Sequence, residues 1–241
     1  MLEGMYDIHT HMIPHVDDGA DTIQITKKLL QMEYNDGVRT IFATSHFRRR
    51  MFETPMEKIE REYEKVKQAA QEIAPDLRVI LGCEFHANLE MVEMLEAKKR
   101  PTMGNSRCVL TEFSESHGFR FIQERCYDLM SNGYEPIIAH AERYPVLRKN
   151  IDYLEQLVDM GAYIQMNADS ISGLEGFGMK HFCKKVMKQN LLHFVGSDAH
   201  NIKDRKPGMA RCAKYIEKAM GREYAEKILI DNPREIIEEG R

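Results

Sequence analysis

Two kinds of segment alternate along this chain. Short apolar runs rich in β-forming residues recur seven times, and longer segments with apolar positions at helical spacing lie between them. This order is typical of repeated β–α units, in which parallel strands form a sheet and helices cover it. The predicted strands span residues 6–11, 39–44, 78–85, 108–113, 135–140, 162–167 and 193–198.

The clearest helix signal follows the second predicted strand. The segment 54–57 (Thr-Pro-Met-Glu) has the spacing of a capping box with proline at the first helical position, and apolar residues continue at helical spacing. Further helices are predicted at about 22–35, 87–98, 119–132, 150–160, 178–189, 205–219 and 222–231. Gly37, Gly133 and Gly161 lie where helices should end.

The length and the unbroken alternation predict one domain. A chain of 241 residues is long enough for an α/β barrel, and no linker or repeat interrupts the pattern. We therefore expect a single domain over 1–241, in which seven parallel strands form a barrel with helices outside. The C-terminal ends of the strands would then form the functional face.

Composition excludes several classes of protein. Hydrophobic residues make up 43% and charged residues 30%, with no apolar stretch of about 20 residues, so a membrane span is excluded. The residues before the first predicted strand leave no room for a signal peptide, which indicates a cytoplasmic protein. Five scattered cysteines without a C-x-x-C pair fit reduced core residues. A formal charge of −4 argues against nucleic-acid binding.

Histidines and carboxylates fall at the C-terminal ends of the predicted strands, which converge on one face of a parallel barrel. His9-Thr10-His11 and Asp198-Ala199-His200 each place two side chains on one side of an extended segment. A single pair of this kind is as often structural as metal-binding, but several candidates at neighbouring strand ends predict a metal centre. The other strand ends contribute His46, Glu84, Glu112 and His140.

The types of ligand indicate the kind of ion and substrate. With Asp18, in the loop after the first predicted strand, the set has five imidazoles, four carboxylates and no thiolate, which suits Mn²⁺, Fe²⁺ or Zn²⁺. Nine ligands are too many for one ion and suit two or three. Three divalent ions carry more charge than four carboxylates neutralise, so the site would attract an anion such as a phosphate ester.

Six motifs carry a resemblance to a known family. The segments 7–11, 16–19, 44–46, 82–84, 139–144 and 196–200 resemble the metal-binding motifs of the PHP (polymerase and histidinol phosphatase) superfamily, across nearly the whole chain. More narrowly, Asp17-Asp18-Gly19-Ala20 and His140-Ala141-Glu142-Arg143-Tyr144 resemble the bacterial protein-tyrosine phosphatases of capsule and exopolysaccharide clusters, the CpsB/CapC type.

The resemblance implies a distorted TIM-like (β/α)7 barrel and a cluster of two to three divalent ions, usually manganese, with iron, zinc, cobalt and magnesium as alternatives. It implies metal binding by His9, His11, Asp18, His46, Glu84, Glu112, His140, Asp198 and His200. It also makes Arg143 the phosphate-binding residue, acting in catalysis with Asp198 and His200.

Several assignments stay open at this point. The sequence alone also allows Arg143 to form a surface ion pair with Glu142, and either Asp17 or Asp18 to be the ligand. Family members often carry a polar residue where Phe47 follows His46, which puts substrate contacts in question. The remaining histidines are expected to support the site or simply to be hydrogen-bonded, with His86 nearest to it: His15, His86, His117, His181 and His193.

Arg48-Arg49-Arg50 follows the candidate ligand His46 directly. Such a run usually faces solvent. Its position also suggests that Arg48 binds substrate, and that the run attracts an acidic phosphorylated segment.

The expected reaction is hydrolysis of phosphotyrosine by a metal-bound hydroxide. No cysteine has an arginine six positions later, as a thiolate phosphatase would require. The resemblance implies a tyrosine-phosphorylated partner, namely the tail of a bacterial tyrosine kinase that controls polysaccharide synthesis. The alternatives are a phosphatase for histidinol phosphate or another small phosphomonoester, and a metal-stabilised phosphotyrosine-binding protein without turnover. Nuclease activity is disfavoured by the acidic balance.

Overall fold

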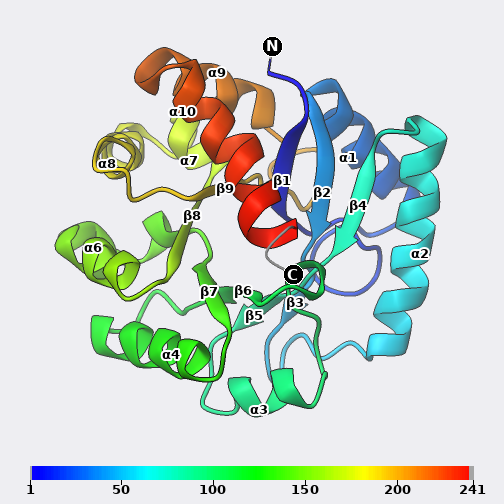
Figure 1. The fold of residues 1–241 in the computed structure, drawn as a ribbon. Coiled ribbons are helices and arrows are strands. Elements are labelled where there is room, and N and C mark those ends of the chain that lie inside the picture. Colours follow the sequence, from blue (N-terminus) through cyan, green and yellow to red (C-terminus); the bar gives the residue numbers. More distant parts are fainter. Residues whose placement is uncertain (1, 239–241) are drawn as a thin grey trace.

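The computed structural model describes residues 2–238 of the chain. Its strands form one curled, entirely parallel arrangement with helices around the outside (Figure 1). The strands pair in the orders β1-β2-β4 and β3-β5-β6-β7-β8-β9. They are β1 (Met5–Thr10), β2 (Val38–Ala43), β3 (His46–Phe47), β4 (Arg78–Leu81), β5 (Glu84–His86), β6 (Cys108–Glu112), β7 (Glu135–Ile138), β8 (Tyr163–Asn167) and β9 (Phe194–Gly196).

Eight of these nine segments occupy the seven predicted strand positions. The predicted strand 39–44 forms as β2, and β3 is a further short strand beyond it that the sequence did not predict. The predicted strand 78–85 is divided into β4 and β5. The pairing persists on both sides of the break, with Ala43 opposite Leu81 and His46 opposite Glu84. Gly82 lies at the bend, where a Cβ atom would come within 2.9 Å of the Met103 sulfur. The bend allows β5 to pair with β6, which β4 does not.

The last strand meets the first, as the barrel prediction requires. The Asp198 amide donates to the His9 carbonyl, and the His11 amide donates to the Ala199 carbonyl, both at 2.8 Å. The strands approach closely here because Gly196 has no side chain. A Cβ atom at Gly196 would lie 2.4 Å from the His9 Cβ. The result is a distorted parallel barrel.

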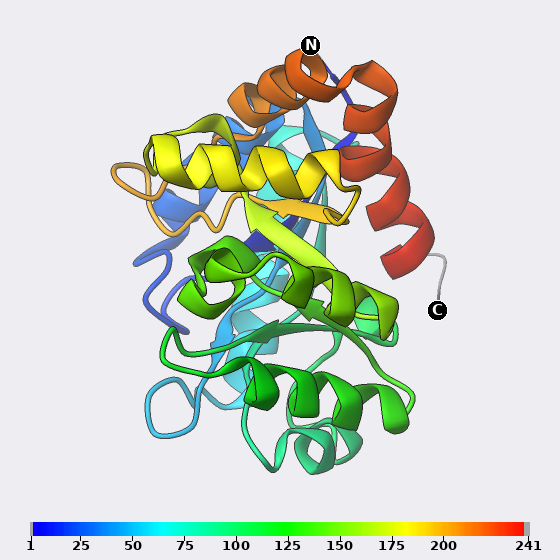
Figure 2. The ribbon, with the colours of Figure 1, turned by 90° about the vertical axis from the view of Figure 1, so that its left-hand side faces the viewer.

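Helices surround the sheet on the outside (Figures 1 and 2). The longer ones are α1 (Ile23–Asn35), α2 (Met56–Ile73), α4 (Phe119–Ser131), α6 (Asp152–Asp159), α8 (Phe177–Lys188) and α9 (Met209–Met220). The short ones are α3 (Met91–Glu96), η1 (Met103–Asn105), η2 (Ala141–Arg143), α5 (Pro145–Lys149), α7 (Ala168–Ser172) and α10 (Arg222–Glu226). Two π-helical segments, η3 (Lys227–Asp231) and η4 (Pro233–Glu238), extend the last helix. Within residues 2–238, no helix is long and apolar enough to cross a bilayer.

Some helix boundaries differ from those predicted. The predicted helix at 87–98 forms only over α3, and that at 205–219 begins at Met209. The prediction of a capping box at Thr54 is wrong. The Thr54 hydroxyl donates to the Val16 carbonyl at 2.6 Å, and α2 begins after Pro55. The predicted helix ends are confirmed, since Gly37, Gly133 and Gly161 follow α1, α4 and α6 with positive φ.

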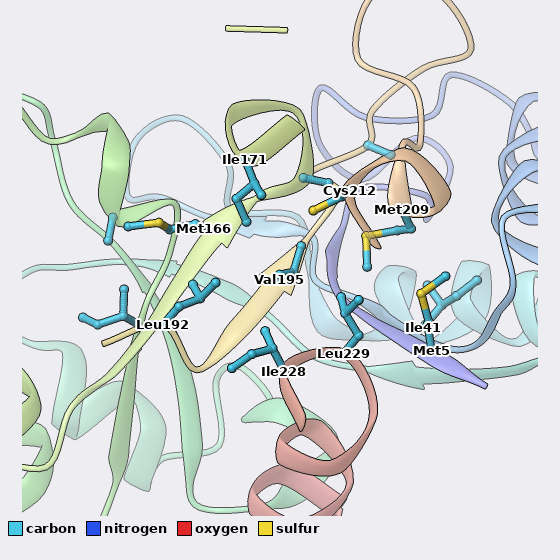
Figure 3. Close-up of a cluster of buried hydrophobic side chains, with 14 of the residues drawn as sticks. Met5, Ile41, Met166, Ile171, Leu192, Val195, Met209, Cys212, Ile228 and Leu229 are labelled. Atoms are coloured by element: carbon cyan, nitrogen blue, oxygen red, sulfur yellow. The ribbon is translucent and has the colours of Figure 1, made fainter. Parts of the chain in front are cut away.

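The apolar core lies in two layers. One fills the space between the sheet and the helices, where strand residues such as Ile41 and Val195 face Met209 and Leu229 (Figure 3). The other fills the barrel interior and includes Tyr6, Ile8, Phe42, Cys108, Leu110, Ile137, Phe194 and Ile237. All five cysteines are buried, as predicted.

The buried His193 makes the stability of the folded protein depend on pH. The Ile164 amide donates to His193 Nδ1 at 3.2 Å, and burial lowers the pKa of His193 to about 4, below its ordinary value of 6.5. The stabilisation is therefore complete above pH 6.5 and is lost as the pH falls toward 4, because only the unfolded chain takes up the proton.

We expect His193→Asn, which retains an acceptor for Ile164, to remove this term. The unfolding free energy, measured by urea denaturation between pH 4.5 and 7, should fall less steeply with decreasing pH in the variant than in the unaltered protein. The two slopes should differ by up to about 1.4 kcal/mol per pH unit. His15→Asn, at an exposed position, is the matched control. An unchanged slope in His193→Asn would contradict the assignment.

Candidate metal centre

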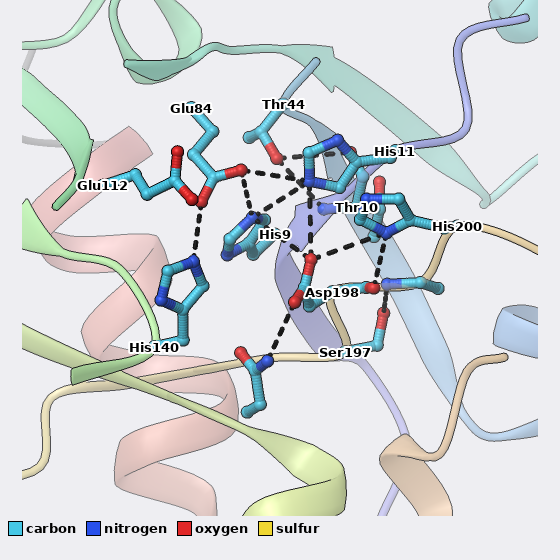
Figure 4. Close-up of polar contacts among 12 residues, drawn as sticks. His9, Thr10, His11, Thr44, Glu84, Glu112, His140, Ser197, Asp198 and His200 are labelled. Carbon is cyan, nitrogen blue, oxygen red and sulfur yellow. Dashed lines mark hydrogen bonds and ion pairs between the residues drawn. The ribbon is translucent and has the colours of Figure 1, made fainter. Parts of the chain in front are cut away.

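The nine side chains predicted to bind metal converge at the C-terminal ends of the strands. Figure 4 shows His9, His11, Glu84, Glu112, His140, Asp198 and His200. Four belong to strands: His9 to β1, His46 to β3, Glu84 to β5 and Glu112 to β6. The others lie beyond strand ends: His11 and Asp18 after β1, His140 after β7, and Asp198 and His200 after β9. The parallel arrangement therefore brings together all the residues that the sequence proposed.

Glu84 is the common partner of four imidazoles. Its Oε2 lies 3.1 Å from His9 Nε2, 3.2 Å from His11 Nε2 and 2.9 Å from His46 Nδ1. Its Oε1 lies 2.8 Å from His140 Nε2. The Glu84 side chain is fully buried, so its charge has to be balanced by neighbouring groups instead of by water.

Oxygen partners fix the ring proton of three imidazoles. His9 Nδ1 lies 3.3 Å from Gln165 Oε1, and His11 Nδ1 lies 2.9 Å from Asp17 Oδ2. His200 Nδ1 lies 2.8 Å from the main-chain carbonyl two residues earlier. Each oxygen accepts the Nδ1 proton, which leaves the Nε2 lone pair available to a metal ion.

Several atoms of the cluster lack a matching hydrogen-bond partner among the described residues. The Nε2 atoms of His9 and His11 lie 3.2 Å apart, where two lone pairs repel each other unless a proton or cation intervenes. Glu112 Oε2 and His200 Nε2 are buried without a hydrogen bond, and Glu84 Oε2 has only the close contacts with imidazole nitrogens given above, none of them in hydrogen-bond geometry. Buried polar atoms are seldom left in this state. The donor set therefore fits divalent cations.

The candidate ligands form three overlapping groups. In each group the ligand atoms lie within 4.8 Å of one another. The groups are His11 with Asp18, His46 and His200; His9 with His11 and Glu84; and His46 with Glu84 and Glu112. Because the groups share members, neighbouring cations bound there would share ligands.

The charges within the cluster are strongly coupled. Burial disfavours the imidazolium of His9, but Glu84 and Asp198 outweigh this effect and raise the pKa of His9 to about 9. Burial also opposes the charge of His46, yet Glu84 raises the pKa of His46 to about 10. Burial and the nearby Glu84 charge raise the pKa of Glu112. The cluster thus holds protons that cations would displace, so metal affinity should rise with pH.

Asp17 and Asp18 have different surroundings. Asp17 Oδ2 accepts from His11 Nδ1 and from the His46 amide, both at 2.9 Å, and Asp17 Oδ1 accepts from the Gly19 amide. Asp18 is half-exposed, with Oδ1 3.5 Å from His46 Nε2 and 3.6 Å from His200 Nε2. This geometry favours Asp18 as a ligand and gives Asp17 the task of orienting His11.

Two candidate ligands adopt backbone conformations that are rare for residues with side chains. His140 has φ of 32° and Asp198 has φ of 56°, both in the left-handed region. Such conformations persist only where the surroundings enforce them, and they concentrate at functional sites.

Asp198 lies between two arginines. Arg143 Nη1 is 2.8 Å from Asp198 Oδ2, and Arg205 Nη2 is 2.9 Å from Asp198 Oδ1. Asn167 Nδ2 also donates to Asp198 Oδ2, at 3.0 Å. The alternative pairing of Arg143 with Glu142 is not observed, since Glu142 is buried and accepts from the Asn167 amide.

Sequence reasoning missed Arg205 and Asn167. Arg205 falls in the predicted helix 205–219, but α9 begins later and Arg205 lies in a loop, where its carbonyl accepts from the His200 amide at 2.8 Å. Asn167 ends β8, just as candidate ligands end other strands. That shared position is the signal that could have identified Asn167.

An open pocket of about 260 Å³ reaches the cluster. Asp18, His46, Glu84, Glu112, His140 and Asp198 line it together with Arg48, Met51, Phe52, Arg143 and Arg205. Three guanidinium groups around a cation-binding floor suit the oxygens of a phosphate group.

Only the first of the three consecutive arginines lines this pocket. Arg48 and Phe52 exchange main-chain hydrogen bonds at 3.0 and 2.8 Å, which closes a tight hairpin over 48–52. Arg49 forms an ion pair with Glu90, and Arg50 is exposed at the turn. The structure therefore separates the three arginines instead of presenting them as one surface.

Two further residues singled out from the sequence lie outside the pocket lining. His86 Nε2 lies 3.1 Å from Ser114 Oγ, and burial with the charge of Arg48 lowers the pKa of His86 to about 4. Phe47 is buried and packs edge-on against Phe85, with ring centroids 4.9 Å apart. The apolar residue at position 47 therefore serves the core.

A family model described as "Capsular polysaccharide synthesis, CpsB/CapC" matches residues 5–238. The chain belongs to the CpsB/CapC family. The tyrosine-protein phosphatase CpsB of Streptococcus pneumoniae is 41% identical over 238 residues, which cover 97% of this chain and 98% of that protein. The tyrosine-protein phosphatase YwqE of Bacillus subtilis is 32% identical over 220 residues, covering 91% and 86%.

Solved structures agree with this membership. A chain from the crystal structures of B. subtilis YwqE and S. pneumoniae CpsB, described as metal-dependent tyrosine phosphatases, matches with a TM-score of 0.89 and 29% identity over 98% of this chain and 95% of that one. The histidinol phosphate phosphatase of Lactococcus lactis matches with a TM-score of 0.59 and 14% identity, covering 90% and 94%. At that identity the similarity concerns the fold alone.

Replacing each aspartate by asparagine should separate the two roles in this CpsB/CapC protein. We expect Asp18→Asn to bind fewer Mn²⁺ ions, because it loses a carboxylate ligand. Asp17→Asn should keep the stoichiometry but bind about 10- to 100-fold more weakly, because His11 is less well oriented. Metal analysis and calorimetric titration of stripped protein measure both quantities. A lower stoichiometry in Asp17→Asn alone would reverse the assignment.

Proposed function

We propose that this chain is a metal-dependent protein-tyrosine phosphatase that acts on phosphotyrosine in a partner protein. The observation that carries the proposal is the pocket in which Arg48, Arg143 and Arg205 surround the three overlapping ligand groups. Full-length similarity to proteins named tyrosine-protein phosphatases supports it.

The proposed cofactor is a set of two or three divalent ions, with manganese as the first candidate. The residues that would hold them are His9, His11, Asp18, His46, Glu84, Glu112, His140, Asp198 and His200. When bound, such ions lower the pKa of water and neutralise charge on a phosphoryl group.

The proposed roles of the protein groups follow from their positions. Arg143 and Arg205 reach the pocket beside Asp198 and would bind the equatorial oxygens of the phosphoryl group, where negative charge shifts during transfer. Arg48 would hold the same group from the opposite hairpin. Water would attack phosphorus as the bond to the phenolic oxygen breaks, and the proton of the attacking water would pass to the phosphate that forms. Tyrosinate would leave with little need for an acid, since its parent pKa is near 10.

The cysteines do not favour a covalent route. All five are buried, and burial raises the pKa of Cys126 to about 12. A thiol held in that state supplies little thiolate near neutral pH.

We further propose that the partner is the tyrosine-phosphorylated tail of a bacterial kinase that controls capsular polysaccharide synthesis. The family description supports the link to capsule synthesis. Histidinol phosphate is the competing substrate to be tested.

The first test is turnover by metal-stripped protein. We expect negligible hydrolysis of a phosphotyrosine peptide without metal, restoration by Mn²⁺, and loss in His9→Ala, measured as released phosphate. Histidinol phosphate should compete poorly. Turnover confined to histidinol phosphate would replace the tyrosine-phosphatase assignment by that of a histidinol-phosphate phosphatase. Metal binding without any turnover would favour a phosphotyrosine-binding protein.

Arginine variants test the phosphate pocket. Arg143→Ala and Arg205→Ala should each lower kcat/KM for a small aryl phosphate by about 100-fold, the usual effect of losing one donor to developing charge. Arg49→Ala, whose guanidinium is paired with Glu90, is the matched control and should retain full activity. If Arg205→Ala matches this control, Arg205 has no part in phosphate binding.

A further inference from the structure

A basic surface lies on α8 and α9, which are neighbours in the fold (Figures 1 and 2). From Gly176 through Ser197 the chain has four lysines and no Asp or Glu, although the whole protein has a formal charge of −4. We call the surface formed by the following residues the α8–α9 surface: Phe177, Lys184, Lys185, Lys188, Lys214, Tyr215 and Lys218.

The lysines of the α8–α9 surface have no close opposite charge among residues 2–238. None of these five lysines has an ion-pair partner there, and only three lysines in the same part of the chain, all on α1 or α2, have one. Lys27 pairs with Glu72, Lys65 with Glu62, and Lys67 with Glu64. Like charges held together in this way repel one another and attract an anionic partner.

An apolar pocket opens within the α8–α9 surface. It measures about 560 Å³ and is lined by Phe177, Gly178, Lys180, His181, Lys184 and Tyr215. Lys180 lies over the Tyr215 ring, 4.2 Å from its centroid. Phe177 is 93% exposed, and the nearby Leu174 is 59% exposed. Aromatic and aliphatic surface beside unpaired lysines is typical of a contact site for another molecule.

This surface adjoins the candidate active site through a short connection. Asn167, which donates to Asp198, is followed by α7 and a loop that reaches Phe177 within ten positions. A peptide chain bound in the pocket could therefore continue onto α8.

We propose that the α8–α9 surface docks an acidic peptide segment that flanks the phosphotyrosine of the substrate protein. The lysines would pair with its carboxylates, and the pocket at Tyr215 would take one of its apolar side chains. A peptide fits better than an anionic membrane, because the segment before α8 follows directly on Asn167, which contacts Asp198 at the active site. This inference rests on the proposed phosphatase function.

The test compares two phosphotyrosine peptides that differ only in their flanks, one rich in Asp and Glu and the other with Asn and Gln instead. In Lys184→Glu/Lys185→Glu, we expect KM for the acidic peptide to rise about 10-fold with kcat unchanged, while the neutral peptide and free phosphotyrosine are unaffected. Lys98→Glu/Lys99→Glu is the matched control, since it reverses two adjacent lysines outside the α8–α9 surface. Phe177→Ser should also raise KM for the acidic peptide.

Other outcomes overturn the proposal. An unchanged KM for the acidic peptide, or equal losses on the neutral peptide and free phosphotyrosine, would exclude docking on this surface. If Lys184→Glu/Lys185→Glu loses binding to phosphatidylglycerol vesicles while its kinetics on both peptides are unchanged, the surface binds membranes instead. If free phosphotyrosine is not hydrolysed at all, the proposed function fails separately. In that case, fluorescence anisotropy with the unphosphorylated acidic peptide still tests docking. Weaker binding by Lys184→Glu/Lys185→Glu would support docking, and equal binding would overturn it.

Discussion

The carboxylate of Glu84, buried among four imidazoles, is the interaction on which the functional face depends. A buried carboxylate is stable only when opposite charge or several donors surround it. Here the facing groups include His9 and His11, whose ring protons are held on the far side by Gln165 and Asp17. Their Nε2 atoms therefore face the carboxylate, and a proton or a cation has to lie between them. The candidate metal centre is thus part of the packing of the barrel.

This arrangement accounts for irregular features of the fold. The bends after β2 and β4 bring His46 opposite Glu84. The absence of a side chain at Gly196 lets the last strand approach the first, beside His9. His140 and Asp198 take left-handed backbone conformations just past their strands. Each irregularity lies where a candidate ligand has to point inward. The left-handed conformations of His140 and Asp198 are also locally unfavourable, as expected when strain serves a site.

Much of the fold and of the ligand set could be predicted from the sequence, because both follow from local pattern. Strand periodicity and helix-ending glycines depend on near neighbours, and parallel strands necessarily bring their C-terminal ends together. Arg205 could not be found in this way, because its role depends on the loop that replaces the start of a predicted helix. The choice between Asp17 and Asp18 likewise depends on how one loop folds against β3.

The charged groups near the pocket, and not the net charge of the protein, govern how an anionic substrate would approach. At physiological ionic strength, charges are screened beyond about 8 Å, so the formal charge of −4 spread over the molecule has little influence at the pocket. A phosphate group entering the pocket would instead meet Arg48, Arg143 and Arg205, which line it beside the candidate metal ligands. Since these groups would recognise the phosphate and not the protein that carries it, discrimination among phosphorylated proteins would have to come from surface outside the pocket.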